Sequence, residues 1–187
     1  MKLSKTIFAA LIAAMAMSCA EQPKEQTVME EKNQVIETIM ARRSIRKYQD
    51  RPVSRDTLNK IMECGINAPN GQNRQSWEVR VVDNPEVMNY IKQVMIEAYD
   101  EKVVGCFRGA PVMVFIARDV NYDFSAYDCG LMAENMMLAA QSLGVGSICL
   151  GSPVRLINDN PALERVFSSW GIINSEFSFS DTFDNLY

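Results

Sequence analysis

Two short stretches of this chain hold side chains of the kinds that bind ligands by charge and hydrogen bonding. The basic run, residues 42–46 (RRSIR), places three guanidinium groups and a hydroxyl in one short piece of chain. Guanidinium forks with a hydroxyl suit a phosphate dianion. The amide loop, residues 68–77 (APNGQNRQSW), carries several side-chain amides around a glycine. Amides beside closely approaching backbone suit the polar edge of a flat heteroaromatic ring.

Each stretch also has a plainer explanation. Charged residues at the end of a helix commonly form nothing more than a solvated surface. Asparagine and glycine after proline are ordinary turn residues. Neither stretch decides between these interpretations by itself.

Composition removes several classes of chemistry. The chain has 187 residues, is 48% hydrophobic and fits one domain with a sizeable core. Its net charge of −4 argues against nucleic acid as the main partner. It contains no histidine, which excludes Ser-His-Asp and Cys-His catalysis and the usual zinc sites. We therefore expect no metal centre, and we expect a bound cofactor or other side chains to supply any chemistry.

The first residues have the pattern of an export signal. Lys2 and Lys5 precede an apolar stretch, residues 6–17, that is too short to span a bilayer. Small residues then lead to Cys19, which predicts a lipoprotein-type signal over residues 1–18 and lipidation of Cys19. The alternatives are an ordinary cleaved signal, and a cytoplasmic protein whose translation starts at Met29. Residues 19–33 are polar and read as a tether.

The other cysteines lie in apolar runs and form no C-x-x-C pair. We expect them to be small buried side chains, and the sequence does not assign disulfide partners. They are Cys64, Cys106, Cys129 and Cys149.

Periodicity and caps place the two stretches on secondary structure. Asn33 can cap a helix that ends in the basic run, and if that helix continues, Arg42 and Arg46 share one face. Ser54 can cap a second helix, which the Ala68-Pro69 pair stops before the amide loop. A strand at residues 77–81 follows, and a third helix starts after Asn84.

The second half continues the alternation of strands and helices. The apolar run at residues 112–117 predicts a central strand, and residues 125–143 predict a long helix with Gly144 as its C′ residue. A short strand is expected at residues 147–150, and a last helix is expected with Asn160 as its cap. Strands that alternate with helices favour a sheet covered by helices on both faces.

The order of these pieces resembles the FMN-dependent nitroreductase family over residues 34–171. The resemblance rests on the Arg-Arg-Ser-x-Arg run, the amide loop that leads into a strand, and a long helix followed by Leu143-Gly144-Val145-Gly146 and Leu150-Gly151-Ser152-Pro153. It implies an α+β fold with a mixed central sheet covered by helices on both faces, and a homodimer with FMN at the subunit interface. It also implies a ping-pong reaction, in which NAD(P)H reduces the flavin and the flavin reduces a nitroaromatic, quinone or similar acceptor.

The resemblance also assigns roles by position. Arg42 would meet the phosphate, Arg43 and Ser44 would line the ring and ribityl chain, and Arg46 would lie near the flavin N1/O2 edge. The partner subunit would contribute Pro69, Asn70, Gly71 and Asn73. Residues that would pass along the ring are Cys149, Leu150 and Gly151.

The chain departs from the family pattern after Gly171, where members continue to another strand and a basic C-terminal arm. Residues 172–187 are a divergent or truncated tail with no lysine or arginine after Arg165. Two alternatives to the reductase follow. One is a non-catalytic envelope lipoprotein that binds flavin weakly or not at all, and the other is a different flavin reaction on this fold, such as dehalogenation or flavin breakdown.

Overall fold

The computed structural model describes residues 32–169 and 177–179. The unit described below begins at Gln34. The predicted signal over residues 1–18, Cys19 and nearly all of the tether lie outside the described residues, as does most of the tail. Among the described residues, no helix is both long enough and apolar enough to cross a membrane.

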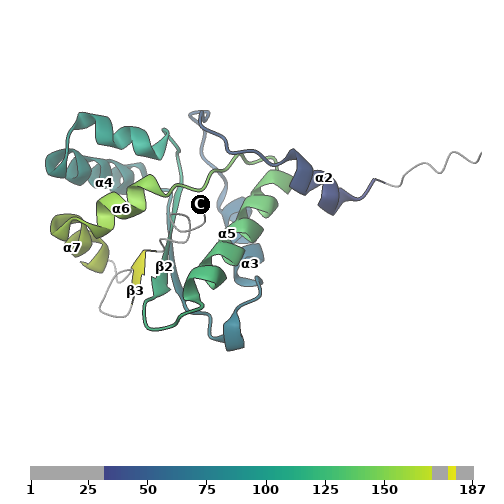
Figure 1. Ribbon diagram of the computed structural model, residues 1–187. Helices are drawn as coiled ribbons and strands as arrows, with labels where there is room; N and C mark the ends of the chain where they lie inside the picture. Colours follow the sequence, from purple (N-terminus) through teal and green to yellow (C-terminus); the bar gives the residue numbers. More distant parts are fainter. Residues whose placement is uncertain (1–31, 170–176, 180–187) are drawn as a thin grey trace, which may run out of the picture. The chain divides into compact units, whose positions relative to one another are not determined.

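Helices account for most of this unit (Figure 1). The α-helices are α2 (Gln34–Ala41), α3 (Arg55–Ile66), α4 (Pro85–Ala98), α5 (Ser125–Ser142), α6 (Ser152–Asn158) and α7 (Pro161–Ser169). Two 3₁₀ segments, η1 (Gly71–Asn73) and η2 (Glu101–Phe107), lie in the connections. The strands are β1 (Trp77–Val82), β2 (Met113–Asp119) and β3 (Phe177–Phe179).

The described strands form one antiparallel sheet in the order β1-β2-β3. Strand β1 pairs along its whole length, from Trp77 opposite Arg118 to Val82 opposite Met113. Strand β3 pairs only with the last residues of β2, where Phe179 lies opposite Ala117. The expected central strand is thus β2, which lies between the other two.

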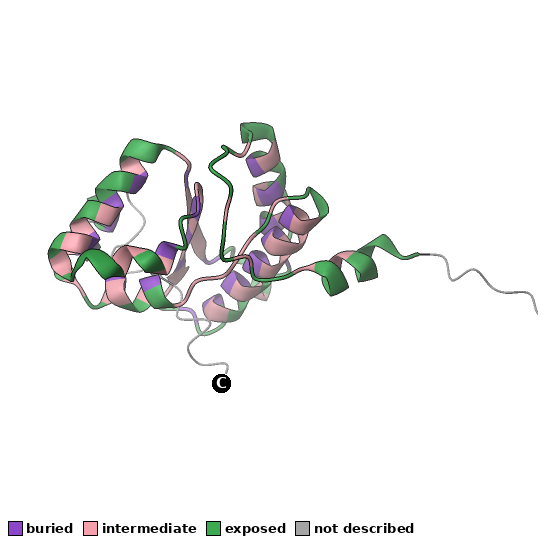
Figure 2. Ribbon diagram, turned by 90° about the horizontal axis from the view of Figure 1, so that it is seen from above, coloured by how far each residue is buried: buried purple, intermediate pink, exposed green. Residues whose placement is uncertain are grey.

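Alternate side chains of β2 enter two different cores. Met113, Phe115 and Ala117 belong to a buried cluster with residues of α4, α6 and α7. Val114 and Ile116 pack against a second cluster, built from α3 and α5. Figures 1 and 2 show α3 and α5 on one side of the sheet and α4, α6 and α7 on the other, with buried positions facing inward. The α+β class with helices on both faces is therefore confirmed.

Several predicted helix ends are confirmed by their capping contacts. The Ser54 side chain accepts a hydrogen bond from the Thr57 backbone N–H at 3.2 Å, and Asn84 Oδ1 accepts one from Glu86 N–H at 2.8 Å. Asn160 Oδ1 likewise accepts from Ala162 N–H at 2.9 Å at the start of α7. Gly144 follows α5 with φ of +71°, the left-handed conformation expected of a C′ glycine.

Three local predictions differ from the structure. Residues 147–150 do not form a strand; within the described residues Ser147 makes only an isolated parallel bridge to Ser44. The N-terminal helix ends at Ala41, immediately before the basic run, so Arg42 and Arg46 do not share a helical face; residues 44 and 45 are extended and reach Ser147. Helix α6 and the segment η2 were not expected, since both are too short to show a clear hydrophobic period.

Helices α3 and α5 pack closely at Gly65. A Cβ built at this position would lie 2.6 Å from Met136 Cγ, so the two helices approach at a distance that only glycine allows. Gly65 is buried although it lies inside a helix, where glycine normally costs stability relative to alanine. Glycine at this position therefore lowers the helix propensity of α3 but permits close contact between the two helices that support one face of the sheet.

We predict that Gly65→Ala lowers the free energy of unfolding by about 1–3 kcal/mol, because overpacking outweighs the gain in helix propensity. Urea denaturation followed by circular dichroism measures the change. Gly105→Ala is the matched control, because a Cβ there meets nothing within 4 Å. Equal stability of the Gly65→Ala and wild-type proteins would contradict the close-packing argument.

Candidate functional site

The basic run leaves α2 as extended chain and lies beside the segment that follows α5. Ser44 forms a parallel bridge with Ser147, and the Ile45 N–H donates to the Ser147 carbonyl oxygen at 3.0 Å. This contact brings residues 42–46 next to the chain that leads to Cys149, Leu150 and Gly151. Two of the three predicted groups of site residues are therefore neighbours in one protomer.

The arginines of the basic run have different partners. Arg42 Nε lies 3.3 Å from Glu134 Oε1 on α5, and both side chains are partly exposed. Arg43 Nη1 donates to the carbonyl oxygens of Met40 and Arg42, each at 2.6 Å, and so caps the end of α2. Arg46 Nη1 donates to the Ser44 carbonyl oxygen at 3.2 Å.

Two of these cations keep donors for a ligand. A guanidinium group has five N–H donors, and the contacts of Arg43 and Arg46 use few of them. Both side chains are exposed, as is Ser44, and neither arginine has an acidic partner within the described part of the chain. The arrangement can bind an anion, with Arg42 shared between that anion and Glu134.

The segment after Ser147 offers backbone rather than reactive side chains. Burial, above all, raises the pKa of the Cys149 thiol to about 11, so this thiol is protonated at neutral pH. Leu150 packs against the cluster shared with α4, α6 and α7, and Gly151 immediately precedes α6. Since Cys149 is neutral, this segment can cover a planar group but cannot act as a nucleophile.

The amide loop has a constrained backbone. Gln72, Asn73 and Gln75 all have positive φ, at 57°, 55° and 51°. Asn70 Oδ1 accepts a hydrogen bond from Gln75 N–H at 3.0 Å, which closes the loop on itself. The exposed side chains of Gln72, Asn73 and Gln75 leave their amides available to a ligand, and Pro69 is exposed beside them.

The amide loop and the basic run are attached near different ends of α5. The Gly71 N–H donates to Asp128 Oδ1 in the first turn of α5 at 2.9 Å, whereas Ser147 follows its last turn. Helix α5 has 18 residues and is about 27 Å long. Figure 1 shows the purple chain after α2 near the upper end of α5 and the blue turn after α3 near the opposite end. Among the described residues, no hydrogen bond or ion pair joins residues 42–46 to residues 69–73.

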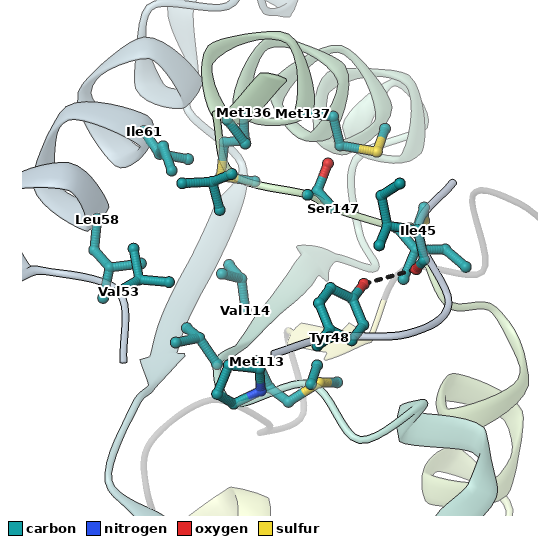
Figure 3. Close-up of a pocket in the computed structure, with 18 of the residues that line it drawn as sticks. Ile45, Tyr48, Val53, Leu58, Ile61, Met113, Val114, Met136, Met137 and Ser147 are labelled. Atoms are coloured by element: carbon teal, nitrogen blue, oxygen red, sulfur yellow. Dashed lines mark hydrogen bonds between the residues drawn. The ribbon is translucent and has the colours of Figure 1, made fainter. Parts of the chain in front are cut away.

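A cavity of about 760 Å³ lies between β2, α3 and α5, and Ile45 of the basic run and Ser147 also line it (Figure 3). Most of its wall is apolar, with side chains including Leu58, Ile61, Met113, Val114 and Met136. Cys149 and Leu150 line it, but the arginines of the basic run and the amide loop do not. Two cationic side chains, Lys47 and Arg51, also line it, so the cavity combines apolar and cationic surface beside Cys149 and Leu150.

Sequence reasoning missed two acids that organise the site. Asp128 and Glu134 contact the amide loop and the basic run, respectively. Asp128 stands in an otherwise apolar stretch, Ala126-Tyr127-Asp128-Cys129, and an acid in such a context was the available signal. No group of three or more potential metal ligands occurs among the described residues.

Comparisons with known proteins define the class. The family model described as the nitroreductase family matches residues 39–166. A crystal structure of a nitroreductase with bound FMN from Bacteroides fragilis NCTC 9343 is 30% identical, covers 80% of this chain and 85% of that one, and has a TM-score of 0.67. A nitroreductase with bound FMN from Desulfitobacterium hafniense DCB-2 is 28% identical, covers 80% of this chain and 86% of that one, and has a TM-score of 0.68.

The chain therefore belongs to the nitroreductase family. Among curated relatives, the NADPH-flavin oxidoreductase of Vibrio harveyi is 33% identical over 133 residues, which are 64% of this chain and 54% of that protein. The matches to the first three curated relatives span 62%, 66% and 54% of those relatives' lengths.

Proposed function

We propose that the chain is an FMN-dependent oxidoreductase that works as a homodimer. It takes hydride from NAD(P)H and reduces nitroaromatic, quinone or similar small acceptors by a ping-pong mechanism. The observation that carries the proposal is the pair of exposed arginines, Arg43 and Arg46, beside an extended backbone segment. This arrangement occurs in a chain that is 30% and 28% identical to two nitroreductases solved with bound FMN.

The residues present fit FMN, which when bound supplies the electron chemistry. The phosphate would meet Arg42, with the Ser44 hydroxyl and Arg43 along the ribityl chain and ring. Arg46 would lie at the N1/O2 edge, where a cation stabilises the negative charge of the reduced ring. Cys149, Leu150 and Gly151 would cover the ring with backbone and apolar surface. No protein acid or base is required, so the absence of histidine is no obstacle.

The exposed apolar residues of α2 and α5 support a homodimer. Ile39 and Met40 on α2 are 49% and 69% exposed, and Tyr127 and Leu131 on α5 are 67% and 46% exposed. Helix α5 already buries Met132 and Met136 on its other side, so it is apolar on both faces. A helix with two apolar faces is normally covered on both, and exposed apolar surface of this kind marks interaction sites.

A dimer also completes the site. Within one protomer the amide loop is attached to the first turn of α5, away from the arginines. Pro69, Asn70, Gly71 and Asn73 would therefore reach a flavin held by the partner's basic run. A site shared between two protomers explains how two ligand-binding stretches that do not meet within one chain would bind one cofactor.

The deciding experiment is the visible spectrum of the purified mature chain. A yellow dimer that carries one FMN per subunit and is bleached by NAD(P)H supports the proposal. A colourless dimer that ignores added FMN favours the non-catalytic lipoprotein. Flavin that is bleached but passes electrons to none of the acceptors named above favours a different flavin reaction.

The same preparation tests the role of Arg46. We predict that Arg46→Ala slows reduction of bound FMN about tenfold or more while weakening FMN binding less, because one charge-assisted contact is worth about 1.5–3 kcal/mol. Stopped-flow absorbance with NAD(P)H measures the rate. Arg165→Ala removes the same charge from an exposed arginine on α7 that does not line the cavity, and it should change nothing. A wild-type reduction rate in Arg46→Ala would contradict the role assigned to Arg46.

Subunit mixing tests the shared site. Arg46→Ala and Asn73→Ala homodimers each have both sites damaged, whereas a heterodimer of the two has one intact site. Refolding an equal mixture should therefore restore intact sites to about a quarter of the wild-type number, because half of the dimers are mixed. Reductase activity after refolding measures the recovery. Failure of the mixture to exceed either variant alone would place both residues in the same protomer's site.

We propose further that the protein is a lipid-anchored protein of the bacterial envelope, with residues 1–18 removed and Cys19 lipidated. The support comes from the sequence: a basic start, a short apolar stretch and small residues before Cys19. The hydride donor in that compartment would have to be present outside the cytoplasm.

We predict that Cys19→Ser releases the protein from membranes into the soluble fraction, because a serine cannot take the thioether-linked lipid. Fractionation with immunoblotting measures the distribution. Cys64→Ser is the matched control and should leave it unchanged. Unchanged partitioning of Cys19→Ser contradicts the anchor, and an intact N-terminus at Met29 would point to the cytoplasmic alternative.

A further inference from the structure

The amide loop is joined to the helical body by a buried carboxylate. Asp128 is 3% exposed, and its Oδ1 accepts the Gly71 N–H at 2.9 Å. This contact links residues that are 57 positions apart in the chain. The hydrogen bond from Gln75 N–H to Asn70 Oδ1 is local, and a second long-range contact, from Asp119 N–H to the Ser76 carbonyl oxygen at 3.1 Å, holds the end of the loop beside β2.

The shape that Asp128 holds is not one that the loop adopts without support. Three non-glycine residues within four positions, Gln72, Asn73 and Gln75, have φ between 51° and 57°. Left-handed backbone at non-glycine residues costs of order 1 kcal/mol each and persists only where surrounding contacts impose it. Such strain is typical of segments that present side chains to a ligand.

A tyrosine holds the loop from its other side. The Arg74 guanidinium lies 4.4 Å from the centre of the Tyr122 ring, in cation–π geometry. The Tyr122 hydroxyl lies so close to Gly71 that there is no room for a Cβ. Gly71 is therefore held between Tyr122 and Asp128, and its position sets the path of the residues that follow it.

Asp128 is a costly residue for stability alone. Its Oδ2 is buried and has no hydrogen-bond partner among the described residues. A buried carboxylate with an unsatisfied oxygen destabilises the fold, although its place in the first turn of α5 offsets part of this cost through the helix dipole. Buried unsatisfied groups of this kind call for a functional explanation.

We propose that Asp128 is the positioning residue that fixes the amide loop in its flavin-binding conformation, acting through the Gly71 N–H. It contacts the loop and not the ligand. The proposal rests on the proposed function, because the loop serves the partner's flavin. Its structural half, that Asp128 holds the loop, is testable without any flavin.

Two measurements on the dimer test the proposal. The FMN dissociation constant is measured by titrating apoprotein and following flavin fluorescence, and amide hydrogen exchange of the peptide covering residues 69–76 is measured on the apoprotein. Asp128→Ala should raise the dissociation constant about tenfold or more and speed exchange in that peptide, because Gly71 loses its acceptor. Asp128→Asn retains an acceptor oxygen and should rescue most of both effects.

Asn135→Ala is the matched control. Asn135 Nδ2, also on α5, donates to the Cys64 carbonyl oxygen at 3.2 Å, so the variant removes one side-chain-to-backbone hydrogen bond without touching the loop. It should lower the melting temperature and leave both loop readouts unchanged. If it weakens FMN binding as much as Asp128→Ala does, the effect is general destabilisation and the proposal is overturned.

A second variant reaches the loop without altering Asp128. Gly71→Ala places a Cβ against the Tyr122 hydroxyl and should displace the loop, with the same loss of FMN affinity and faster exchange. If Asp128→Ala does not fold, Gly71→Ala becomes the test of the proposal. A wild-type FMN dissociation constant together with wild-type amide exchange in Gly71→Ala would overturn it. If the wild-type dimer binds no FMN, the proposed function fails, and exchange alone decides whether Asp128 holds the loop.

Discussion

The alternation of side chains along β2 is the constraint on which the rest of the structure depends. Because successive residues of a strand point to opposite faces, Met113 and Phe115 enter one core while Val114 and Ile116 enter the other. Each core fixes a layer of helices, and the layer of α3 and α5 positions the candidate site. The close contact at Gly65 sets the spacing of these two helices, and α5 then carries Glu134 beside the basic run and Asp128 beside the amide loop.

Helix α5 separates the two groups of candidate ligand-binding residues rather than bringing them together. The extended chain that carries the arginines pairs with Ser147, beyond the last turn of α5. The amide loop has a strained backbone and is hydrogen-bonded to Asp128 in the first turn of α5. The helix is about 27 Å long, so its two ends lie far apart within one protomer. The same helix exposes Tyr127 and Leu131. In the proposed dimer a second copy would pack against these side chains, on the helix that connects the two groups.

Much of the fold could be predicted from sequence because its signals are local. Ser54, Asn84 and Asn160 cap helices through contacts within three residues, and an unbroken apolar run identified β2 as a central strand. The failures are non-local. Whether residues 147–150 form a strand depends on neighbouring backbone, and the end of α2 depends on Ser44 reaching Ser147. The anchoring role of Asp128 was hidden because its partner lies 57 residues away and is a backbone amide without a side-chain signature.

The burial of sulfur has a consequence for redox behaviour. Burial raises the pKa of Cys149 to about 11, and burial with the adjacent Asp128 carboxylate raises that of Cys129 to about 12. At neutral pH roughly one Cys149 thiol in ten thousand is ionised, and the thiolate is the form that attacks peroxides and disulfides. Raised pKa values therefore make both thiols slow to undergo sulfenylation and mixed-disulfide formation at neutral pH.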